Sequence, residues 1–540
     1  MLSYRKLAMR VLGRPLHTGG GIDSPRPASQ RAAAFVLTAA MLITLAAPAF
    51  AGTWYIENGD ITVKASGTEG KNKVSQGNNP EVEDTDTIIT NQKTDKASSH
   101  TVTIDAGNDK VKVTLEDVNI KADSGSALTS KGDVTLTLKG DNHLTGGNGD
   151  TYGGSGISSS GSLTISGGET DSLTAQGGSG ANGISSSGSL TISGGTVTAN
   201  GDDGGSGIYS RGGVTISGGS TVTANGDDGT ISGGDGICSS GGVTISGGST
   251  VTANGGNGGS IGGGSGIYSN GSVTISGGTV TAKGGSGEDG YGGDGIRSIS
   301  GGVTISGGTV TANGGNSTNS SGGYGISSLD VAISSGTVTA NGGDSKDGYG
   351  GDGIHSGSID LSGSLELTAK AGSPNGKALS RAGSELELDT IKDKLGPGAK
   401  VTATDADGKV IDQVSISRPV EPEEPSSSSD GGSAAPSAPA SSLPGLTVTD
   451  KDGQRISYTS TQSGNTLTVC VGRFTASFRV SLAALRQLRA EGIETITFQT
   501  ILCSTTLSVD ELLAMGGEDA EVVLTHHIRS STLTVGGKAV

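Results

Sequence analysis

The stretch SGIYSRGGVTISGGSTVTANG, Ser206–Gly226, recurs with small changes through the middle of the chain and decides its fold. The next copy, DGICSSGGVTISGGSTVTANG, spans Asp235–Gly255, and related copies fill residues 150–370. Each copy opens with Gly-Ile, and the isoleucines lie 24 to 30 residues apart, which is a solenoid period. These marker residues are Ile157, Ile184, Ile208, Ile237, Ile267, Ile296, Ile326 and Ile354.

The pattern inside each copy indicates the type of solenoid. VTI and TVTA alternate apolar and small polar residues, which is typical of strands with one buried face. Gly-Gly, Ser-Gly and Asn-Gly pairs separate these strands and predict turns with positive φ. We therefore expect an all-β fold, a right-handed single-stranded parallel β-helix with three short strands per turn. Ile, Val and Ala should point inward, Thr and Ser outward, and the Asn that ends TVTAN should stack into an amide ladder between coils.

Composition and charge narrow the possible partners. The 540 residues include 99 glycines and 3% aromatic residues, which suits a thin column of small aliphatic side chains better than a globular core. The formal net charge is −17. Because binding to phosphate groups needs a basic face, nucleic acids and anionic membrane surfaces are not expected partners.

Residues 1–51 resemble a bacterial export signal. Basic residues precede the apolar run Ala32–Ala47, which ends in Pro48-Ala49-Phe50-Ala51. An A-x-A ending predicts cleavage before Gly52, and the run is short for a membrane span. We expect a secreted or cell-surface protein without membrane insertion after cleavage.

The remaining chain divides into four parts by composition. Residues 52–126 form an N-terminal cap and the first coils, 127–418 the β-helix repeats with a C-terminal cap, 419–444 a Pro/Ser-rich linker, and 445–540 a small α+β domain. That last domain is expected to contain a helix over Ser481–Glu491 and a second helix opened by a capping box at Ser508. Cys470 and Cys503 lie on its expected strands, where they can pair.

Two Asp-Asp pairs follow consecutive TVTAN strands at the same offset: Asp202, Asp203, Asp227 and Asp228. In register, the carboxylates would repel one another by roughly 1–3 kcal/mol per close pair. Bound Ca²⁺ would reverse that penalty, because hard cations prefer clustered oxygens. The alternative is that these Asp-Gly segments make turns and point into water. GGDGI phrases at Asp235, Asp294 and Asp352 are only weakly similar to the GGxGxD calcium repeat.

A second column consists of the residue after each Gly-Ile, which must face outward because the isoleucine faces inward. It includes Tyr209, Tyr268, Arg297 and His355. The two tyrosines are two coils apart, about 10 Å, and their rings can stack on sugars. Arg297 can pair with a uronate carboxylate. The alternative is ordinary variation at a tolerant surface position.

Enzyme chemistry has little support, and we expect no catalytic activity. Polysaccharide lyases on this scaffold combine a calcium cluster with a basic residue that abstracts a proton. Arg211, Lys283 and Arg297 qualify for that role by position only. No Ser-His-Asp order, HExxH or phosphate-binding loop is found, and the glycine content makes any GxGxxG match uninformative.

The phrases DGIxSxGxVTISGGTVTANG and TWYIENGDITV resemble a family of secreted bacterial carbohydrate-binding proteins over Gly52–Ser417. The resemblance implies a β-helix of pectate-lyase-like shape that binds calcium and plant-wall polysaccharides, such as polygalacturonate and cellulose, without cleaving them. The leading hypothesis is a non-catalytic, calcium-assisted polysaccharide binder. The alternatives are a structural adhesin that displays loops on a rigid β-helix and, third, a polysaccharide lyase.

Overall fold

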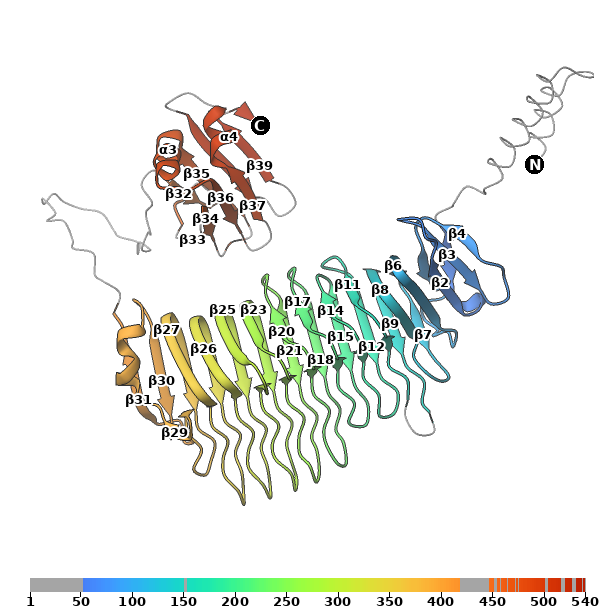
Figure 1. Ribbon diagram of the computed structural model, residues 1–540, viewed down its shortest axis with the longest axis horizontal. Helices are drawn as coiled ribbons and strands as arrows, with labels where there is room; N and C mark the ends of the chain where they lie inside the picture. Colours follow the sequence, from blue (N-terminus) through green and yellow to red (C-terminus); the bar gives the residue numbers. More distant parts are fainter. Residues whose placement is uncertain are drawn as a thin grey trace, which may run out of the picture. The chain divides into compact units, whose positions relative to one another are not determined.

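The computed structural model describes residues 52–149, 153–417 and 446–539, the last range with gaps at 451–453, 457, 464, 472, 474, 501–503, 516–519, 527–530 and 537. It contains 52% strand and 6% helix and is dominated by a parallel β-solenoid of about 13 turns. The chain separates into two compact units, Met1–Arg418 and Pro419–Val540. The predicted leader and linker lie outside the described residues. Figure 1 shows the strands of the first unit stacked side by side along the solenoid.

Each regular coil contributes one strand to each of three stacked files. The first file begins at the Gly-Ile step, the second holds VTI and the third holds TVTAN. The first contains β10 (Ile157–Ser159), β13 (Ile184–Ser186), β16 (Ile208–Ser210), β19 (Ile237–Ser239), β22 (Ile267–Ser269), β24 (Ile296–Ser298) and β28 (Leu379–Arg381). The second contains β11 (Leu163–Ser166), β14 (Leu190–Ile192), β17 (Val214–Ile216) and β20 (Val243–Ile245). The third contains β9 (Asp141–Thr145), β12 (Ser172–Gln176), β15 (Thr196–Asn200), β18 (Thr221–Asn225), β21 (Thr250–Asn254) and β30 (Lys400–Thr404).

Some strands continue around a corner from one file into the next. They are β8 (Leu128–Lys139), β23 (Val273–Lys283), β25 (Gly302–Asn313), β26 (Ile326–Asn341) and β27 (Ile354–Lys370). Pairing is parallel and residue for residue: Ile208 pairs with Ile237, which pairs with Ile267. The predicted parallel β-helix, and the register read from the repeat offsets, are therefore confirmed.

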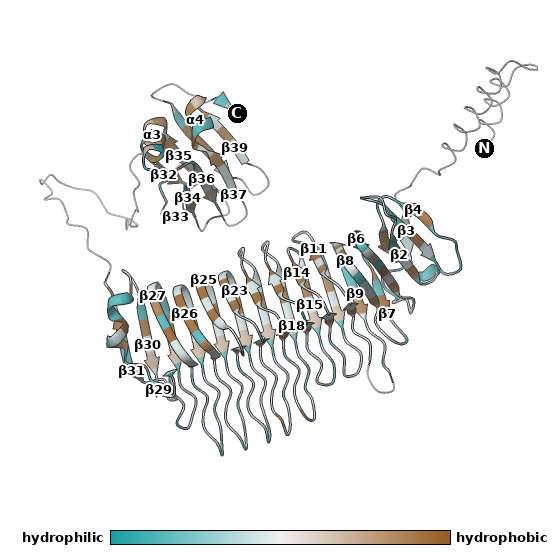
Figure 2. Cartoon of the chain, viewed as in Figure 1, coloured by the Kyte–Doolittle hydropathy of each residue, from teal (hydrophilic) through white to brown (hydrophobic). Residues whose placement is uncertain are grey.

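The interior is a set of narrow columns of aliphatic side chains. Ile, Val, Leu and Ala of all three files are buried in one continuous cluster, and Figure 2 shows apolar residues recurring from strand to strand. The expectation that every Ser points outward is wrong for the last residue of GIxS. Because side chains alternate along a strand, this Ser shares the inward face with Ile. Ser210, Ser239 and Ser269 are buried, and their hydroxyls donate to backbone carbonyls of the preceding coil at 2.9 Å.

The amide ladder predicted for the third file is present. Asn225 donates to the side-chain oxygen of Asn200 and Asn254 to that of Asn225, both at 2.8 Å. Asn341 donates to Asn313 at 2.7 Å on the far side of Lys283, which interrupts the ladder.

Both ends of the solenoid are closed by less regular structure. The first coils use β1 (Thr53–Tyr55), η1 (Ile56–Asn58), β5 (Ile88–Thr90), β6 (Val102–Glu116) and β7 (Asn119–Lys121), and an antiparallel sheet β2 (Ile61–Ala65), β3 (Asn72–Gln76) and β4 (Val82–Asp84) adjoins them. At the other end lie β29 (Ser384–Glu385), η2 (Leu388–Lys394) and β31 (Val410–Ser415), which is antiparallel to β30. Such caps cover the apolar columns that the last coils would otherwise expose.

The loops that follow the third file form a projecting structure, here called the fin: residues 226–234, 255–264, 284–293, 314–323 and 342–351. Figure 1 shows these loops as a row extending away from the strands. Outgoing and returning segments are hydrogen-bonded to each other and to the next coil: Gly264 donates to Gly256 at 2.9 Å, and Gly256 donates to Gly234 at 2.8 Å.

Glycine in the fin serves close packing of backbones. A Cβ on Gly264 would lie 2.0 Å from the carbonyl oxygen of Gly234. Gly264 has no positive φ, whereas Gly218 and Gly219 in the ISGG turn do. The prediction that glycine pairs supply positive φ therefore holds at Gly218 and Gly219, whereas among the fin glycines only Gly262 has a positive φ, of 134°.

Gly264→Ala should destabilise the solenoid by about 1–3 kcal/mol, the usual cost of overpacking, because backbone atoms must move apart. Gly277→Ala is the matched control, since that position has open space and no positive φ. Thermal unfolding followed by circular dichroism compares the two variants. Equal melting temperatures would refute the close-packing role of the fin glycines.

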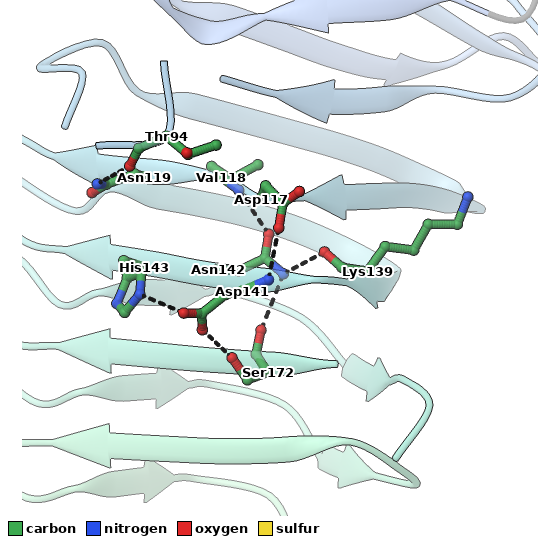
Figure 3. Close-up of polar contacts among 9 residues, drawn as sticks. All are labelled: Thr94, Asp117, Val118, Asn119, Lys139, Asp141, Asn142, His143 and Ser172. Atoms are coloured by element: carbon green, nitrogen blue, oxygen red, sulfur yellow. Dashed lines mark hydrogen bonds and ion pairs between the residues drawn. The ribbon is translucent and has the colours of Figure 1, made fainter. Parts of the chain in front are cut away.

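A buried asparagine interrupts the apolar column of the third file near its N-terminal end. Asn142 pairs in register with Leu173 of the next coil and is fully buried. Its side-chain oxygen accepts from the Val118 amide at 3.0 Å, and its NH₂ group donates to the carbonyls of Lys139 at 3.1 Å and Ser172 at 3.0 Å (Figure 3). Because β7 begins only at Asn119, this side chain supplies an acceptor for the Val118 amide that strand pairing does not provide.

Replacing Asn142 with Leu restores the apolar column yet should lower stability, because a buried group left without its partner costs about 1–3 kcal/mol. Leu173→Val, in the same column, is the control and should cost about 1 kcal/mol. Urea unfolding at fixed pH measures both variants. A fully stable Asn142→Leu protein would show that the three hydrogen bonds contribute nothing net.

The second unit has two sheets and two helices. One sheet has the order β32 (Leu446–Thr449), β35 (Ala476–Ser481), β38 (Glu521–His526), β39 (Ser531–Val535) and β40 (Lys538–Ala539); the other has β33 (Thr459–Ser463), β34 (Thr466–Cys470), β36 (Thr495–Gln499) and β37 (Ser504–Ser508). The helices are α3 (Leu482–Ala490) and α4 (Val509–Ala514). Both predicted helices are present, capped by the hydroxyls of Ser481 and Ser508. Cys470 is a free cysteine, so the pairing predicted with Cys503, which lies outside the described residues, is not formed in this structure.

Candidate functional site

The outward residues of the first file form one straight column, here called the GI row. Strand pairing places them in consecutive coils: Tyr209, Cys238, Tyr268, Arg297, Ser327 and His355. All four residues predicted to contact carbohydrate therefore share one face. Tyr209 and Tyr268 are two coils apart, with Cys238 of the intervening coil between them, so their spacing is about 10 Å.

Three aspartates lie beside the GI row, at the corner where each coil enters the first file. One carboxylate oxygen of each accepts a hydrogen bond from the backbone N–H of the equivalent residue in the next coil. Asp235 accepts from Ser265 at 2.6 Å, Asp294 from Tyr324 at 2.8 Å and Asp352 from Lys377 at 2.7 Å. Asn182 makes the same bond to Ser206 at 2.8 Å. The corner aspartates thus join one coil to the next.

The second carboxylate oxygen of these aspartates faces the GI row residue three positions later. Asp352 lies 2.7 Å from Nδ1 of His355, and Asp294 lies 3.6 Å from Nη1 of Arg297. The His355 ring also stacks on Tyr324, with ring centroids 4.4 Å apart and planes at 14°. These contacts orient the imidazole and the guanidinium instead of leaving them free in solvent.

Burial perturbs the acids of this site. Burial raises the pKa of Asp235 and of Asp294 to about 6, and it raises the pKa of the Cys238 thiol to about 12. Burial also opposes ionisation of Asp352, but the hydrogen bonds from His355 and Lys377 outweigh it and lower its pKa. Carboxyl groups kept in an unfavourable charge state mark candidate functional sites.

The geometry limits what this site can do chemically. Asp294 is 4% exposed, so its carboxyl cannot reach a substrate outside the protein. The Cys238 thiol stays protonated and is a poor nucleophile. The accessible groups are the phenol rings of Tyr209 and Tyr268 and the edges of Arg297 and His355. Such a surface can bind a ligand by stacking and hydrogen bonding.

The four aspartates predicted to bind calcium lie together at the base of the loops. The Asp203 amide donates to the Asp227 carboxylate at 2.8 Å, so the two pairs are adjacent. The Asp228 carboxylate accepts from the Asn257 backbone at 2.6 Å and from its side chain at 3.3 Å. Among the described residues no group of three or more His, Cys, Asp or Glu is arranged to hold a metal ion. As placed, these residues do not fit a closed calcium cage, and calcium binding stays a prediction.

The repeat offsets in the sequence did not predict the contact of Tyr324 with His355, and they did not predict the hydrogen bonds and ion pairs of the corner aspartates. Asp235, Asp294 and Asp352 had suggested only a weak calcium similarity, yet each stands two residues before a marker isoleucine. The position three residues before the GI row would have revealed the pairs Asp294–Arg297 and Asp352–His355. Nothing in the repeat pattern indicated that Tyr324, from the preceding coil, stacks on His355.

Comparisons of the chain with models of known protein families, with curated proteins and with solved structures found no match. None of the helices in the described part of the chain is long and apolar enough to cross a membrane.

Asp294→Asn should make the protein less sensitive to pH. An acid whose pKa is raised on folding contributes stability that is fully present below its unfolded pKa, about 4, and lost as pH rises through the folded value. For Asp294 that window is about pH 4–6. Between pH 4 and pH 7 the free energy of unfolding of the variant should therefore rise relative to that of the wild type, by up to about 3 kcal/mol.

Unfolding by urea across this pH range measures the difference. Exposed Asp344, whose carboxylate makes an equivalent bond to Ser373 at 2.8 Å, provides the control Asp344→Asn. A stability difference for Asp294→Asn that does not change between pH 4 and pH 7 would contradict the account of its burial.

Proposed function

We propose that this protein is an exported, non-catalytic polysaccharide-binding protein that holds an extended glycan along the GI row. The observation that carries the proposal is the placement of Tyr209 and Tyr268 in one outward column, every second coil. Rings at about 10 Å intervals on a rigid sheet suit a chain of sugars whose faces recur every second residue. His355, held by Asp352 and Tyr324, and Arg297 extend the same surface with hydrogen-bond donors.

Charge favours a neutral glycan over a uronate polymer. Arg297, the cation first considered for a uronate, lies 3.6 Å from Asp294 and is partly neutralised by it. The corner aspartates add negative charge along the row, and the whole chain has a net charge of −17. A polyanion approaching this face would meet repulsion, whereas a neutral chain would not.

The adhesin and the lyase are the competing functions. An adhesin would use the same rigid solenoid to present loops to a protein partner and would not bind glycans. A lyase needs an exposed base beside an acidic cluster. Arg211 and Lys283 are exposed but lie on other parts of the coil, outside the GI row, and Arg297, which is in the row, has its guanidinium 3.6 Å from the Asp294 carboxylate. No described feature favours the lyase over simple binding.

A panel of neutral and acidic polysaccharides, tested with and without EDTA, examines the proposal. Neutral glycans should bind, and the double variant Tyr209→Ala/Tyr268→Ala should weaken Kd by about thirtyfold, at ~1 kcal/mol for each of the two stacked rings. Tyr55→Ala, which removes an exposed tyrosine of β1, should leave binding unchanged.

The panel also separates the alternatives. Binding to no glycan would leave the adhesin, and release of unsaturated uronides, read by ultraviolet absorbance, would establish a lyase. Loss of binding in EDTA would support a calcium-assisted mode at the Asp pairs.

A further inference from the structure

The edge of the fin displays large apolar side chains in solvent. Tyr291 and Tyr349 are 65% and 66% exposed, and Ile231 and Ile261 are 59% and 64% exposed. We call these four residues the fin edge. Aromatic residues make up 3% of the chain, so two tyrosines held this far out of the protein need an explanation.

The two fin-edge tyrosines occupy one column with the same repeat as the GI row. Tyr291 pairs in parallel with Gly262 of the preceding coil. The amide of Gly292 donates to Ser321 and that of Gly322 donates to Tyr349, both at 2.9 Å, so Ser321 stands between the two tyrosines. Tyr291 and Tyr349 are thus two coils apart, as are Tyr209 and Tyr268, at about 10 Å.

The fin holds this column rigidly. At the tips, the Asn319 amide donates to Glu288 and the Asp347 amide donates to Thr318, both at 3.0 Å. The Asn319 side chain donates to the Asp289 carboxylate of the preceding coil at 2.7 Å. Together with the close packing of the glycines, these bonds tie each tip to its neighbours, so the tyrosines are presented in fixed positions.

Each fin-edge tyrosine is followed closely along the chain by a corner aspartate and a GI row residue. Tyr291, Asp294 and Arg297 follow one another at three-residue intervals, as do Tyr349, Asp352 and His355. Ion pairs join the second and third members of each set, so the returning segment of each fin loop leads into the GI row.

The two columns lie near each other. Six residues separate Tyr291 from Arg297, so the two positions are at most about 19 Å apart along an extended segment. A chain lying along the solenoid axis can follow either column, and two chains side by side can follow both.

We propose that the fin edge is a second aromatic track, so that the ligand is a neutral polysaccharide fibre whose adjacent parallel chains occupy the fin edge and the GI row. This inference rests on the proposed function. The chains of a fibre share one repeat, as the two columns do. Glu288, Asp289 and Asp347 near the fin edge disfavour polyanionic chains, and the exposed isoleucines complement the apolar faces of sugar rings.

Two probes test the proposal on the full chain: insoluble cellulose, captured by centrifugation, and a soluble cello-hexasaccharide, measured by calorimetry. Tyr291→Ala/Tyr349→Ala should reduce capture by the fibre several-fold while the Kd for the hexasaccharide stays within twofold of wild type. Tyr209→Ala/Tyr268→Ala should weaken both. Leu329→Ala removes another exposed apolar side chain, 57% exposed and outside both columns, and should change neither.

Melting curves establish that each variant is folded before it is scored. Wild-type capture by the fibre in the fin-edge variant would overturn the second track and leave the GI row proposal standing. Equal loss of fibre and hexasaccharide binding in that variant would also overturn it, because the columns would then act as one site. If the wild type binds neither probe nor any other neutral glycan of the panel, the proposed function itself fails.

Discussion

Backbone hydrogen bonding between consecutive coils, in register residue for residue, is the constraint on which the rest of this structure depends. Because equivalent residues stack, a residue type that suits one coil meets the same type above and below it. The consequences are the aliphatic columns, the buried Ser hydroxyls and the Asn ladder. Only where stacking fails does the chain need a special side chain, as at Asn142, which replaces missing backbone partners near the N-terminal end.

The same constraint explains the placement of charge at the candidate site. A corner N–H of each coil needs an acceptor in the coil before it, and Asn182 shows that a neutral side chain is sufficient. Asp at the equivalent positions 235 and 294 makes the same bond at a cost, since burial raises the pKa of both carboxyls to about 6. The second carboxylate oxygen of the corner aspartates contacts the GI row: that of Asp294 faces Arg297, and that of Asp352 faces His355. The aspartates therefore do more than bond one coil to the next: they also orient the side chains of Arg297 and His355.

The repeat offsets predicted the fold class, the register and the common face of Tyr209, Tyr268, Arg297 and His355, because a parallel solenoid converts sequence period directly into neighbours. They failed where neighbours depend on the path of a loop. The fin glycines were expected to form turns, yet Gly264 is required by the approach of Gly234 from another coil. Likewise, the stacking of Tyr324 on His355 joins two coils at a corner whose geometry no offset specifies. The residues of the predicted calcium site are adjacent, as the hydrogen bond from the Asp203 amide to the Asp227 carboxylate shows, and calcium binding there stays a prediction.

The fin loops of neighbouring coils have equal lengths, which the β-helix itself does not require. A β-helix tolerates insertions at a corner, so loops in neighbouring coils are free to differ, and residues 201–206 do form a much shorter loop than the fin. Loops 255–265, 284–294, 314–324 and 342–352 nevertheless have the same length. Equal length allows each tip to bond to the next, as Asn319 does to Glu288 and Asp347 to Thr318. Stability of the solenoid core does not require these bonds, because the core lies in the strand files. What equal loops produce is an extended, regular edge with tyrosines at a fixed repeat, which is the property that a surface for a periodic ligand needs.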